Sequence, residues 1–464
     1  MPNRARTGSA ERPLRVAVVG SGPAGFFTAD ALLRQTTLVA EVDVFERLPT
    51  PYGLVRTGVA PDHARVKTVV AAYEKTAARA AFRFFGNVTL GLDIEIAHLR
   101  PYYDQIVYAV GNEADRRLGV EGEGLWGCIP GAVFVGWYNG HPDYRPAPIR
   151  LDAERVAIIG HGNVAVDVAR ILARTPDELA TTDIADHALE VLRGSQVREI
   201  YVLGRRGPME AAFTPAELKE LTQLPHATVV VDPAELALDE AGRAALASAE
   251  ARTQKNLSML AELARPSEPR ARTIHLRFCR SPLEILGDDF DRVRGLRLEK
   301  NRLERRPDGS VKAVGTGEIE EIAVGMVVPA VGFEGKPLRG VPFDAARRTV
   351  SNRDGRVVDA QGAVVPGEYA VGWAATGAKG LIGTHRGAAT ELVGRMVEDA
   401  QQAAPRRLSP HDAVGELLKT HDVPYVSFDD WKRLDAIEVA RGARRGAPRS
   451  KLTDVDDMLE TLRR

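Results

Sequence analysis

The chain has 464 residues, of which 44% are hydrophobic and 27% charged, and its formal net charge at pH 7 is −1. This balance is typical of a globular protein of about two or three domains, and it excludes general electrostatic binding to nucleic acid or to an anionic membrane. Its only cysteines, Cys128 and Cys279, exclude a disulfide framework, a four-cysteine zinc site and a chain-borne iron–sulfur cluster. No metal site is predicted.

No apolar run reaches the ~20 residues that a membrane span needs. Residues 1–12 also lack the apolar segment of a secretory signal, so we expect a cytoplasmic protein. Residues 1–13 as a whole are expected to form a disordered tail.

The first unit alternates a strand, a glycine turn, a helix and a second strand. The apolar run 14–19 predicts a buried strand, residues 26–33 predict a helix, and residues 42–45 predict the next strand. This order is typical of the first β-α-β unit of a parallel sheet, and it indicates an α/β fold.

The turn inside this unit has the sequence GSGPAG at residues 20–25. Small residues there let the backbone approach a pyrophosphate, which then lies at the N-terminus of the helix. Glu46 follows the next strand, 21 residues after the last glycine, where a carboxylate accepts hydrogen bonds from ribose hydroxyls. The alternative for Glu46 is a solvated strand end. The predicted dinucleotide site comprises Gly20, Gly22, Ala24, Gly25 and Glu46.

A stiff loop with three prolines and two glycines follows at residues 49–63. It is either a structural loop or a backbone wall against a flavin ring. His63 at its end is a candidate for a proton step or for lining the acceptor channel; the alternative is a structural loop histidine.

The same order of elements recurs 140 residues later. Residues 155–159 and 199–203 predict strands, and the turn GHGNVA at 160–165 leads into a helix over 166–172. Ala165 in the third small position fits the dinucleotide fingerprint. The predicted site includes the turn residues Gly160, His161, Gly162, Asn163 and Val164.

Two arginines, Arg205 and Arg206, stand where an acid would mark an NAD site. Paired guanidinium groups bind a 2′-phosphate in fork geometry, so the second site is predicted to prefer NADP(H). The alternative is two surface arginines after a strand. Arg205 lies 40 residues after Ala165, beyond the usual ~20, and an extra helix near residues 182–192 accounts for the excess.

Two acids of this second unit are further candidates. Asp167, one turn into the helix, is a candidate partner for His63 across a domain interface. Glu217 completes the pattern Thr214-Pro215-Ala216-Glu217, a capping box that accounts for it without a ligand. A contact between Glu217 and the nucleotide is the alternative.

Strands over 106–111 and 325–332 both end in glycine and mark candidate hinges near residues 111 and 331. A second dinucleotide-binding domain, 111–330, would then be inserted into a first domain formed by 14–110 and 331–403. Residues 404–464 are expected to form a C-terminal appendage packed on the first domain.

Several longer segments resemble the adrenodoxin-reductase family of ferredoxin–NADP(+) reductases, most closely its bacterial members, which share the appendage. The resemblance runs from about residue 14 to the end of the chain. The segments that carry it lie at 49–63, 83–88, 160–167, 204–208 and 372–384.

The resemblance implies two Rossmann-like domains in a glutathione-reductase-like arrangement, with FAD held non-covalently in the first domain and NADP in the inserted one. The implied FAD contacts are Ala24, Glu46, Leu54, Leu90, Trp373, Gly380, Leu381 and Ile382. The implied NADP contacts are Arg116, His161, Gly162, Asn163, Val164, Arg205, Arg206, Glu217 and Gly380. His161 departs from the small polar residue of relatives, and a protonated side chain there would alter NADP affinity.

The implied activity is hydride transfer from NADPH to FAD, followed by single-electron transfer to a ferredoxin-type iron–sulfur protein. This chemistry requires no nucleophile or general base, because the cofactors carry it. The candidate catalytic residues are His63, for a proton step, and Asp167, as its partner. The alternatives are a flavin monooxygenase or other oxidoreductase, and a non-catalytic nucleotide-binding electron-transfer subunit.

Overall fold

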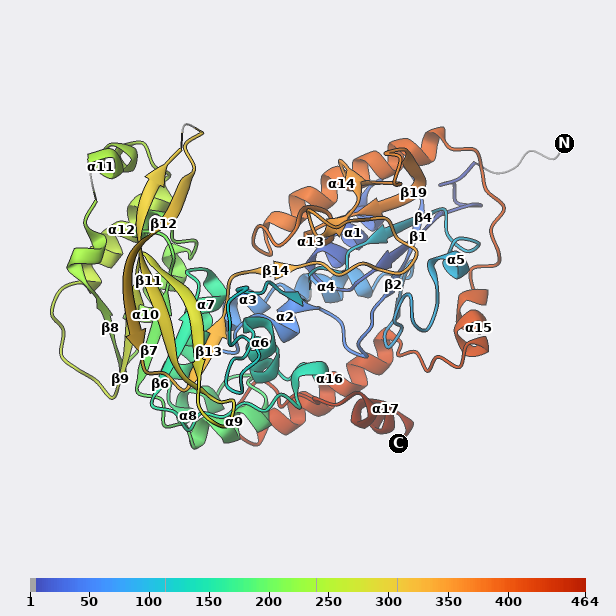
Figure 1. Ribbon diagram of the computed structural model, residues 1–464. Helices are drawn as coiled ribbons and strands as arrows, with labels where there is room; N and C mark the ends of the chain where they lie inside the picture. The colour runs from blue at the N-terminus through green and yellow to red at the C-terminus, as the bar shows by residue number, and fades with distance from the viewer. Residues whose placement is uncertain (1–5, 113, 239, 307) are drawn as a thin grey trace.

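The first parallel sheet carries the N-terminal glycine turn at its carboxyl edge. The computed structural model describes residues 6–464 except 113, 239 and 307, and Figure 1 shows two lobes side by side. The sheet of the first lobe has the order β17-β18-β19-β4-β1-β2-β3, in which β3, β2, β1, β4 and β19 are parallel. Their bounds are β1 (Leu14–Val19), β2 (Ala40–Phe45), β3 (Phe82–Phe85), β4 (Gln105–Tyr108), β17 (Asn352–Arg353), β18 (Arg356–Val358) and β19 (Val364–Ala370).

Helices cover this sheet because its central strands are apolar on both faces. β1 is buried along almost its whole length, as expected for a parallel strand. Phe26 of α1 stacks on Tyr73 of α4 with ring centroids 4.7 Å apart, which fixes both helices on the sheet. The helices of this lobe are α1 (Pro23–Arg34), α2 (Leu54–Thr57), α3 (Ala64–Lys67), α4 (Val70–Ala77), α5 (Ile96–Leu99), α13 (Trp373–Thr376) and α14 (Thr384–Gln402).

The second lobe is built on five parallel strands in the order β13-β6-β7-β9-β8. These are β6 (Arg155–Ile159), β7 (Glu199–Leu203), β8 (Ala227–Val231), β9 (Arg272–Arg277) and β13 (Met326–Pro329). An antiparallel sheet of β10 (Arg280–Gly287), β11 (Val293–Arg305) and β12 (Val311–Ile322) packs beside it. The helices are α6 (Gly131–Asn139), α7 (Asn163–Ala173), α8 (Pro176–Ala180), α9 (Asp186–Arg193), α10 (Pro215–Thr222), α11 (Glu240–Ala247) and α12 (Ala251–Leu263).

The extra helix expected near 182–192 is α9, and α8 precedes it. The two segments that cross between the lobes pair as short antiparallel strands, β5 (Ala114–Asp115) with β14 (Phe333–Glu334). This pairing supports the proposed hinges near residues 111 and 331. No described helix is both long and apolar enough to cross a membrane.

Residues 6–13 differ from the expected disordered tail, whereas residues 1–5 lie outside the described part of the chain. The Gly8 amide donates to the Arg12 carbonyl, and the Val39 amide donates to the Gly8 carbonyl at 2.8 Å. The Arg12 guanidinium pairs with Asp104 at 2.7 Å. Backbone pairing and this ion pair therefore order a segment whose polar composition gave no sign of it.

The C-terminal helices are α15 (Ala413–Thr420), α16 (Phe428–Ala443) and α17 (Val455–Arg463). In the first lobe, Trp431 packs edge-on against Tyr52, and the buried Glu438 carboxylate pairs with Arg56 at 2.5 Å.

The same segment also contacts the second lobe, below which α16 runs in Figure 1. The Lys451 ammonium lies 3.2 Å from Asp183 and donates to the Asn139 carbonyl. The Arg445 guanidinium pairs with Asp186 at 2.6 Å. Residues 404–464 therefore pack on both lobes and not on the first alone, because the buried charges of Glu438 and Lys451 find partners on different lobes.

Candidate dinucleotide sites and the interface between them

The first glycine turn closes tightly under the N-terminus of α1. Gly20 has φ +106°, and a Cβ there would lie 2.5 Å from the Ala109 carbonyl oxygen, so only glycine fits. Gly22 and Gly25 complete the turn, and Ala24 is almost fully buried. The first helical amides thus face the open side of the turn, which is the arrangement that holds a pyrophosphate.

Glu46 lies at the end of β2 and is anchored to this turn. The Ser21 amide and hydroxyl donate to Glu46 Oε2 at 3.0 and 2.6 Å, and the Leu48 amide donates to Oε1 at 3.2 Å. The alternative of a freely solvated strand end is therefore wrong. The carboxylate is oriented by the turn, and its remaining lone pairs can accept from a ribose.

The proline-rich loop lies directly against the first turn. The Tyr52 amide donates to the Ser21 carbonyl at 3.1 Å, and a Cβ on Gly53 would lie 2.9 Å from the Gly22 Cα. Leu54, which starts α2, is exposed beside it. Leu90 instead lies in the buried cluster that contains Val19.

The C-terminal glycine-rich segment approaches the same turn from the other side. A Cβ on Gly372 would lie 2.6 Å from the Ala24 Cβ. Trp373 stacks on Phe333 with centroids 5.7 Å apart, and its indole donates to the Lys379 carbonyl. Gly380, Leu381 and Ile382 follow directly before α14, and Leu381 is 57% exposed. The structure therefore brings the predicted FAD residues to the first turn, except Leu90, which lies in the core.

The second glycine turn repeats the backbone geometry of the first. Gly160 has φ +137°, and a Cβ there would collide with the Ala330 carbonyl. Apart from its neighbours along the chain, no described atom lies within 4 Å of the position that a Gly162 Cβ would take, so this side of the turn is open. Val164 lies in the first turn of α7, and Asn163 Oδ1 accepts from the Thr214 amide at 2.9 Å. The Asn163 side chain is therefore engaged within the protein.

Arg205 and Arg206 are exposed directly after β7. Their backbone is fixed: the Asn301 amide group donates to the Arg205 carbonyl, and the Cys279 amide donates to the Arg206 carbonyl at 3.0 Å. Among the described residues, no carboxylate pairs with either guanidinium. Arg116 is likewise exposed after β5, where its amide donates to the Gly332 carbonyl. Three guanidinium groups thus remain available for an anion.

His161 does not carry the positive charge that its place beside a pyrophosphate predicts. Its ring turns inward, 4.6 Å from the Phe278 ring, and its Nε2 lies 3.2 Å from the Val202 carbonyl. Burial lowers the pKa of His161 to about 4. The enclosure therefore favours the neutral ring over the protonated side chain that the sequence left open.

An ionic cluster joins the two lobes around Arg170 of α7, whose side chain is fully buried. The guanidinium binds Asp62 of the first lobe through two hydrogen bonds of 2.6 and 3.0 Å. It also lies 2.8 Å from Asp167, 3.5 Å from Glu217 and 3.3 Å from Glu220. Burial opposes charge on Asp62, but the Arg170 hydrogen bonds, together with the positive charges of Arg170, Arg174 and His63, outweigh it and lower the pKa of Asp62 to about 2.

His63 enters this cluster from the end of the proline-rich loop. Its Nε2 lies 2.5 Å from Glu220, 3.5 Å from Glu217 and 3.9 Å from Asp167. Burial disfavours the imidazolium, but the hydrogen bond to Glu220 and the nearby carboxylates outweigh it and raise the pKa of His63. The predicted approach of His63 to Asp167 therefore exists only as a weak contact. Glu220 is the direct partner, and no sequence motif marked it.

Glu217 is not held in the predicted capping box. Its amide donates to Thr214 Oγ, but the Thr214 amide is already bound to Asn163, so the carboxylate does not return to it. The carboxylate faces His63 instead. Burial, followed by the charge of Asp167, raises the pKa of Glu217 to about 7.

His63, Asp167 and Glu217 also offer ligand atoms within 4.8 Å of one another, as a metal site would. Arg170 already supplies a positive charge to both carboxylates. The cluster is therefore electrostatically compensated by the chain itself.

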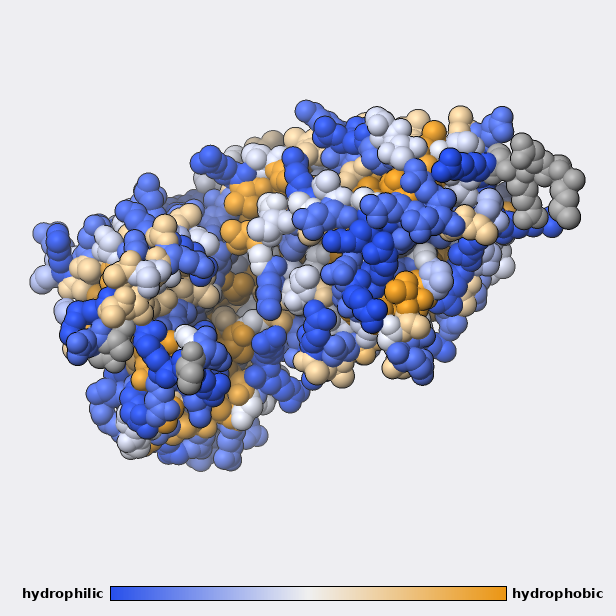
Figure 2. All heavy atoms as spheres, turned by 90° about the horizontal axis from the view of Figure 1, so that it is seen from above, coloured by the Kyte–Doolittle hydropathy of each residue, from blue (hydrophilic) through white to orange (hydrophobic). Residues whose placement is uncertain are grey.

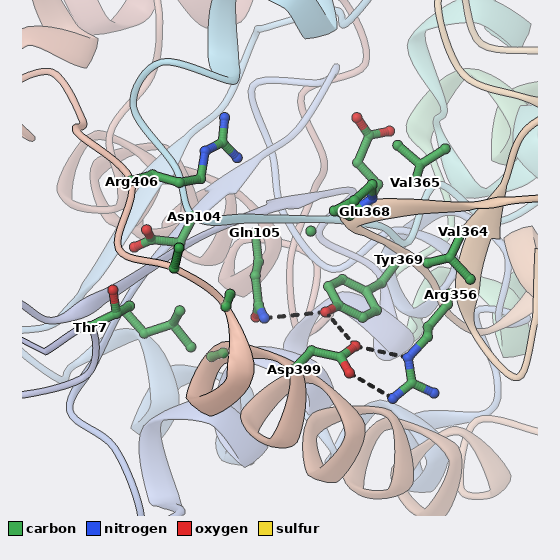
Figure 3. Close-up of a pocket in the computed structure, with 16 residues that line it drawn as sticks. Thr7, Asp104, Gln105, Arg356, Val364, Val365, Glu368, Tyr369, Asp399 and Arg406 are labelled. Atoms are coloured by element: carbon green, nitrogen blue, oxygen red, sulfur yellow. Dashed lines mark hydrogen bonds and ion pairs between the residues drawn. The ribbon is translucent and has the colours of Figure 1, made fainter.

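A cavity of about 450 Å³ lies elsewhere, at the amino ends of β1 and β4 (Figure 3). Its charged walls are paired, since Arg356 and Tyr369 both bond to Asp399 at 2.8–2.9 Å. Ligands of open parallel sheets bind beyond the carboxyl ends of the strands. The surface between the lobes is also hollowed, with apolar side chains along the hollow (Figure 2). Both glycine turns follow the carboxyl ends of their strands, β1 and β6, away from the cavity at the amino ends of β1 and β4.

Two glycine turns on two parallel sheets in one chain define a two-domain dinucleotide-binding oxidoreductase. Residues 14–202 match the family model described as pyridine nucleotide-disulphide oxidoreductase. The NADPH-ferredoxin reductase FprA of Mycobacterium tuberculosis is 41% identical over 97% of this chain and 99% of its own. The mitochondrial NADPH:adrenodoxin oxidoreductase of Arabidopsis thaliana is 40% identical over 99% and 97%.

A solved structure of M. tuberculosis FprA in complex with NADPH has a TM-score of 0.92 and covers 98% of this chain and all of that one, at 42% identity. The chain belongs to the adrenodoxin-reductase family of ferredoxin–NADP(+) reductases. The predicted family and the predicted α/β fold class are thereby confirmed.

Proposed function

We propose that this protein is an NADPH-dependent, FAD-containing reductase that passes electrons singly to a ferredoxin-type iron–sulfur protein. The observation that carries the proposal is the contrast between the two strand ends. A carboxylate, Glu46, is anchored to the first turn, and two exposed guanidinium groups, Arg205 and Arg206, follow the strand beside the second.

The first site fits FAD. The glycine turn presents helix amides to a pyrophosphate, Glu46 faces the ribose position, and Gly372 brings the C-terminal segment against the turn. When bound, FAD and NADPH supply the hydride and one-electron chemistry. The proposed FAD residues are Gly20, Gly22, Ala24, Gly25, Glu46, Leu54, Leu90, Trp373, Gly380, Leu381 and Ile382.

The second site fits NADP(H), because exposed guanidinium groups stand where a carboxylate would repel a 2′-phosphate. The tight turn at Gly160 and the open side at Gly162 allow the backbone to approach a pyrophosphate. The proposed NADP residues are Arg116, Gly160, His161, Gly162, Asn163, Val164, Arg205, Arg206, Glu217 and Gly380. His161 and Asn163 contribute through the backbone, since their side chains are engaged within the protein.

The interface cluster orients the two lobes and holds protons between them. His63 binds Glu220 directly, while Glu217 has a pKa of about 7 and so changes charge near neutrality. We assign His63, with Asp167 as a distant carboxylate partner, to a proton-holding role at this interface rather than to covalent catalysis.

The electron acceptor is a separate protein, because two distant cysteines cannot hold a cluster. The chain is proposed to act in the cytoplasm. It is further proposed to contain an FAD domain (14–110 and 331–403), an NADP domain (111–330) and the C-terminal segment 404–464, which supports both.

The experiment is anaerobic mixing of the purified protein with NADPH and, separately, NADH, followed by a panel of ferredoxins with cytochrome c as the final reporter. Bleaching of flavin absorbance at low NADPH concentration, with cytochrome c reduction only when a ferredoxin is present, is the expected result. Bleaching without turnover on any ferredoxin would point to an oxygenase or another acceptor. A protein that binds no flavin would overturn the proposal.

A further inference from the structure

We propose that His161 is a positioning residue for Arg205 and Arg206, and that it thereby sets the preference for NADPH over NADH. The inference rests on the proposed NADP site. It concerns the one residue of the second turn whose side chain reaches back to the strand that carries the arginine pair.

The His161 ring lies directly against the backbone that precedes the arginines. A Cβ on Gly204 would lie 2.5 Å from His161 Cε1 and closer still to Nδ1, so the ring fills the place of a side chain there. The Nε2–H group donates to the Val202 carbonyl at 3.2 Å. The ring therefore braces the last residues of β7 immediately before Arg205.

The backbone of the same residue holds the segment that follows the arginines. The His161 carbonyl accepts from the amides of Ala212 and Phe213 at 2.8 and 2.9 Å. The Phe213 and Phe278 rings enclose the imidazole, with centroids 5.9 and 4.6 Å away. His161 thus fixes both ends of residues 204–213 to the glycine turn, and with them the distance between pyrophosphate and arginines.

The first turn shows the same connection at the same place. Ser21 also stands between the first two glycines, and its hydroxyl donates at 2.6 Å to Glu46, the residue that follows the next strand. In both turns, the residue between the glycines ties the phosphate-binding backbone to the group proposed to recognise the ribose or its phosphate. A serine reaches a carboxylate, whereas an imidazole reaches the backbone.

This arrangement predicts an effect on one coenzyme only. Pyrophosphate contacts come from the turn backbone and are common to NADPH and NADH, whereas Arg205 and Arg206 would meet only the 2′-phosphate. The neutral His161 ring adds no charge of its own, since its pKa is lowered to about 4. Displacing the ring moves the arginines and leaves the turn glycines in place.

The test is the ratio of KM values for NADPH and NADH, measured with the holoenzyme and ferricyanide as acceptor. His161→Ala is expected to raise KM for NADPH about tenfold and KM for NADH less than about twofold, with kcat unchanged. A tenfold rise corresponds to the loss of one charge-assisted hydrogen bond between an arginine and the 2′-phosphate. His161→Phe, which retains a ring against Gly204, is expected to stay within about threefold. His275→Ala is the matched control, because His275 stacks on Tyr201 in the same lobe but lies on β9.

A double-mutant cycle separates this inference from the proposed function. In an Arg205→Ala/Arg206→Ala background, His161→Ala is expected to leave the coenzyme ratio unchanged. Equal increases in both KM values, or an undiminished effect in that background, would overturn the positioning role. If the double arginine variant itself keeps its preference for NADPH, the proposed 2′-phosphate site fails instead. Should His161→Ala not fold, His161→Ser, which copies the first turn, takes its place with the same expected ratio.

Discussion

The two glycine turns share one backbone and differ in what surrounds it. Both require glycine at the first position, where φ is +106° in Gly20 and +137° in Gly160. After the next strand, the first turn meets a carboxylate held by Ser21, whereas the second meets exposed guanidinium groups braced by His161. In the proposed sites, phosphate binding is thus assigned to the shared backbone, and the choice of nucleotide to the side chains that follow the next strand.

The helices that follow the turns differ in the same way. α1 is fixed by aromatic packing, in which Phe26 contacts Tyr52 and Tyr73. α7 is fixed at the interface by the buried Arg170 and its four carboxylate neighbours. The second unit therefore adds compensated charge at the interface to the apolar burial that both helices share.

The largest effect is expected from Arg170→Met, which should destabilise the packing of α7 at the interface and leave the packing of α1 unchanged. Removing this guanidinium leaves buried carboxylates without compensation, so the free energy of unfolding should fall by about 3–5 kcal/mol. Chemical denaturation at pH 7 measures it. Arg174→Met is the control, because Arg174 is partly exposed and shares only Asp62 and Glu178. A loss below about 1 kcal/mol would show that the cluster does not hold the lobes together.

Arg205→Ala/Arg206→Ala should separate the two coenzymes most clearly. Loss of two charge-assisted contacts to a phosphate is expected to raise KM for NADPH about a hundredfold, with little change for NADH. Steady-state kinetics with both coenzymes measure the ratio. Arg302→Ala removes an exposed, Glu304-paired arginine of the same lobe and should change neither value. An equal loss for both coenzymes would contradict the 2′-phosphate assignment.

Glu46→Ala tests the corresponding position of the first turn. It removes the acceptor of the Ser21 amide and hydroxyl together with the proposed ribose contact, so FAD affinity should fall about tenfold. Equilibrium dialysis followed by flavin absorbance measures the dissociation constant. Glu391→Ala, an exposed carboxylate on α14, is the control. Unchanged FAD binding would mean that Glu46 serves the turn alone.

The smallest effect is a pH dependence of Glu217. Its pKa of about 7 is above the ordinary ~4.3, so the folded chain binds this proton more tightly than the unfolded chain. The stabilisation is complete below about pH 4 and is lost as the pH rises through about 7. Glu217→Gln stays neutral throughout and should be more stable than the parent by about 1–2 kcal/mol at pH 8.5, with no difference near pH 4.

Chemical denaturation at these pH values measures that difference in the free energy of unfolding. For Asp62→Asn, the change in the free energy of unfolding is expected to have the opposite sign. Because the pKa of Asp62 is lowered to about 2, its charged form stabilises the fold at neutral pH, and that contribution disappears as the pH falls through about 2. The asparagine variant should therefore be less stable at pH 7. The same sign for both variants would contradict the description of the cluster.

The sequence by itself determined the two β-turn-α-β units, the acid after one and the arginines after the other, and the extra helix α9. These features are local: apolar runs, glycine spacing and strand ends lie within a few tens of residues, where periodicity and turn chemistry act. The family resemblance added the cofactor and partner expectations on the same motifs.

Only the tertiary structure decided which groups meet across the lobes. Glu220 reaches His63 because α10 packs beside the proline-rich loop, 157 residues away in sequence. Asn163 takes the Thr214 amide and so frees Glu217, the His161 ring turns inward toward Phe278, and Lys451 reaches both lobes. In each case, groups far apart in the sequence compete for one donor, one acceptor or one buried space. Local sequence patterns cannot predict which group wins.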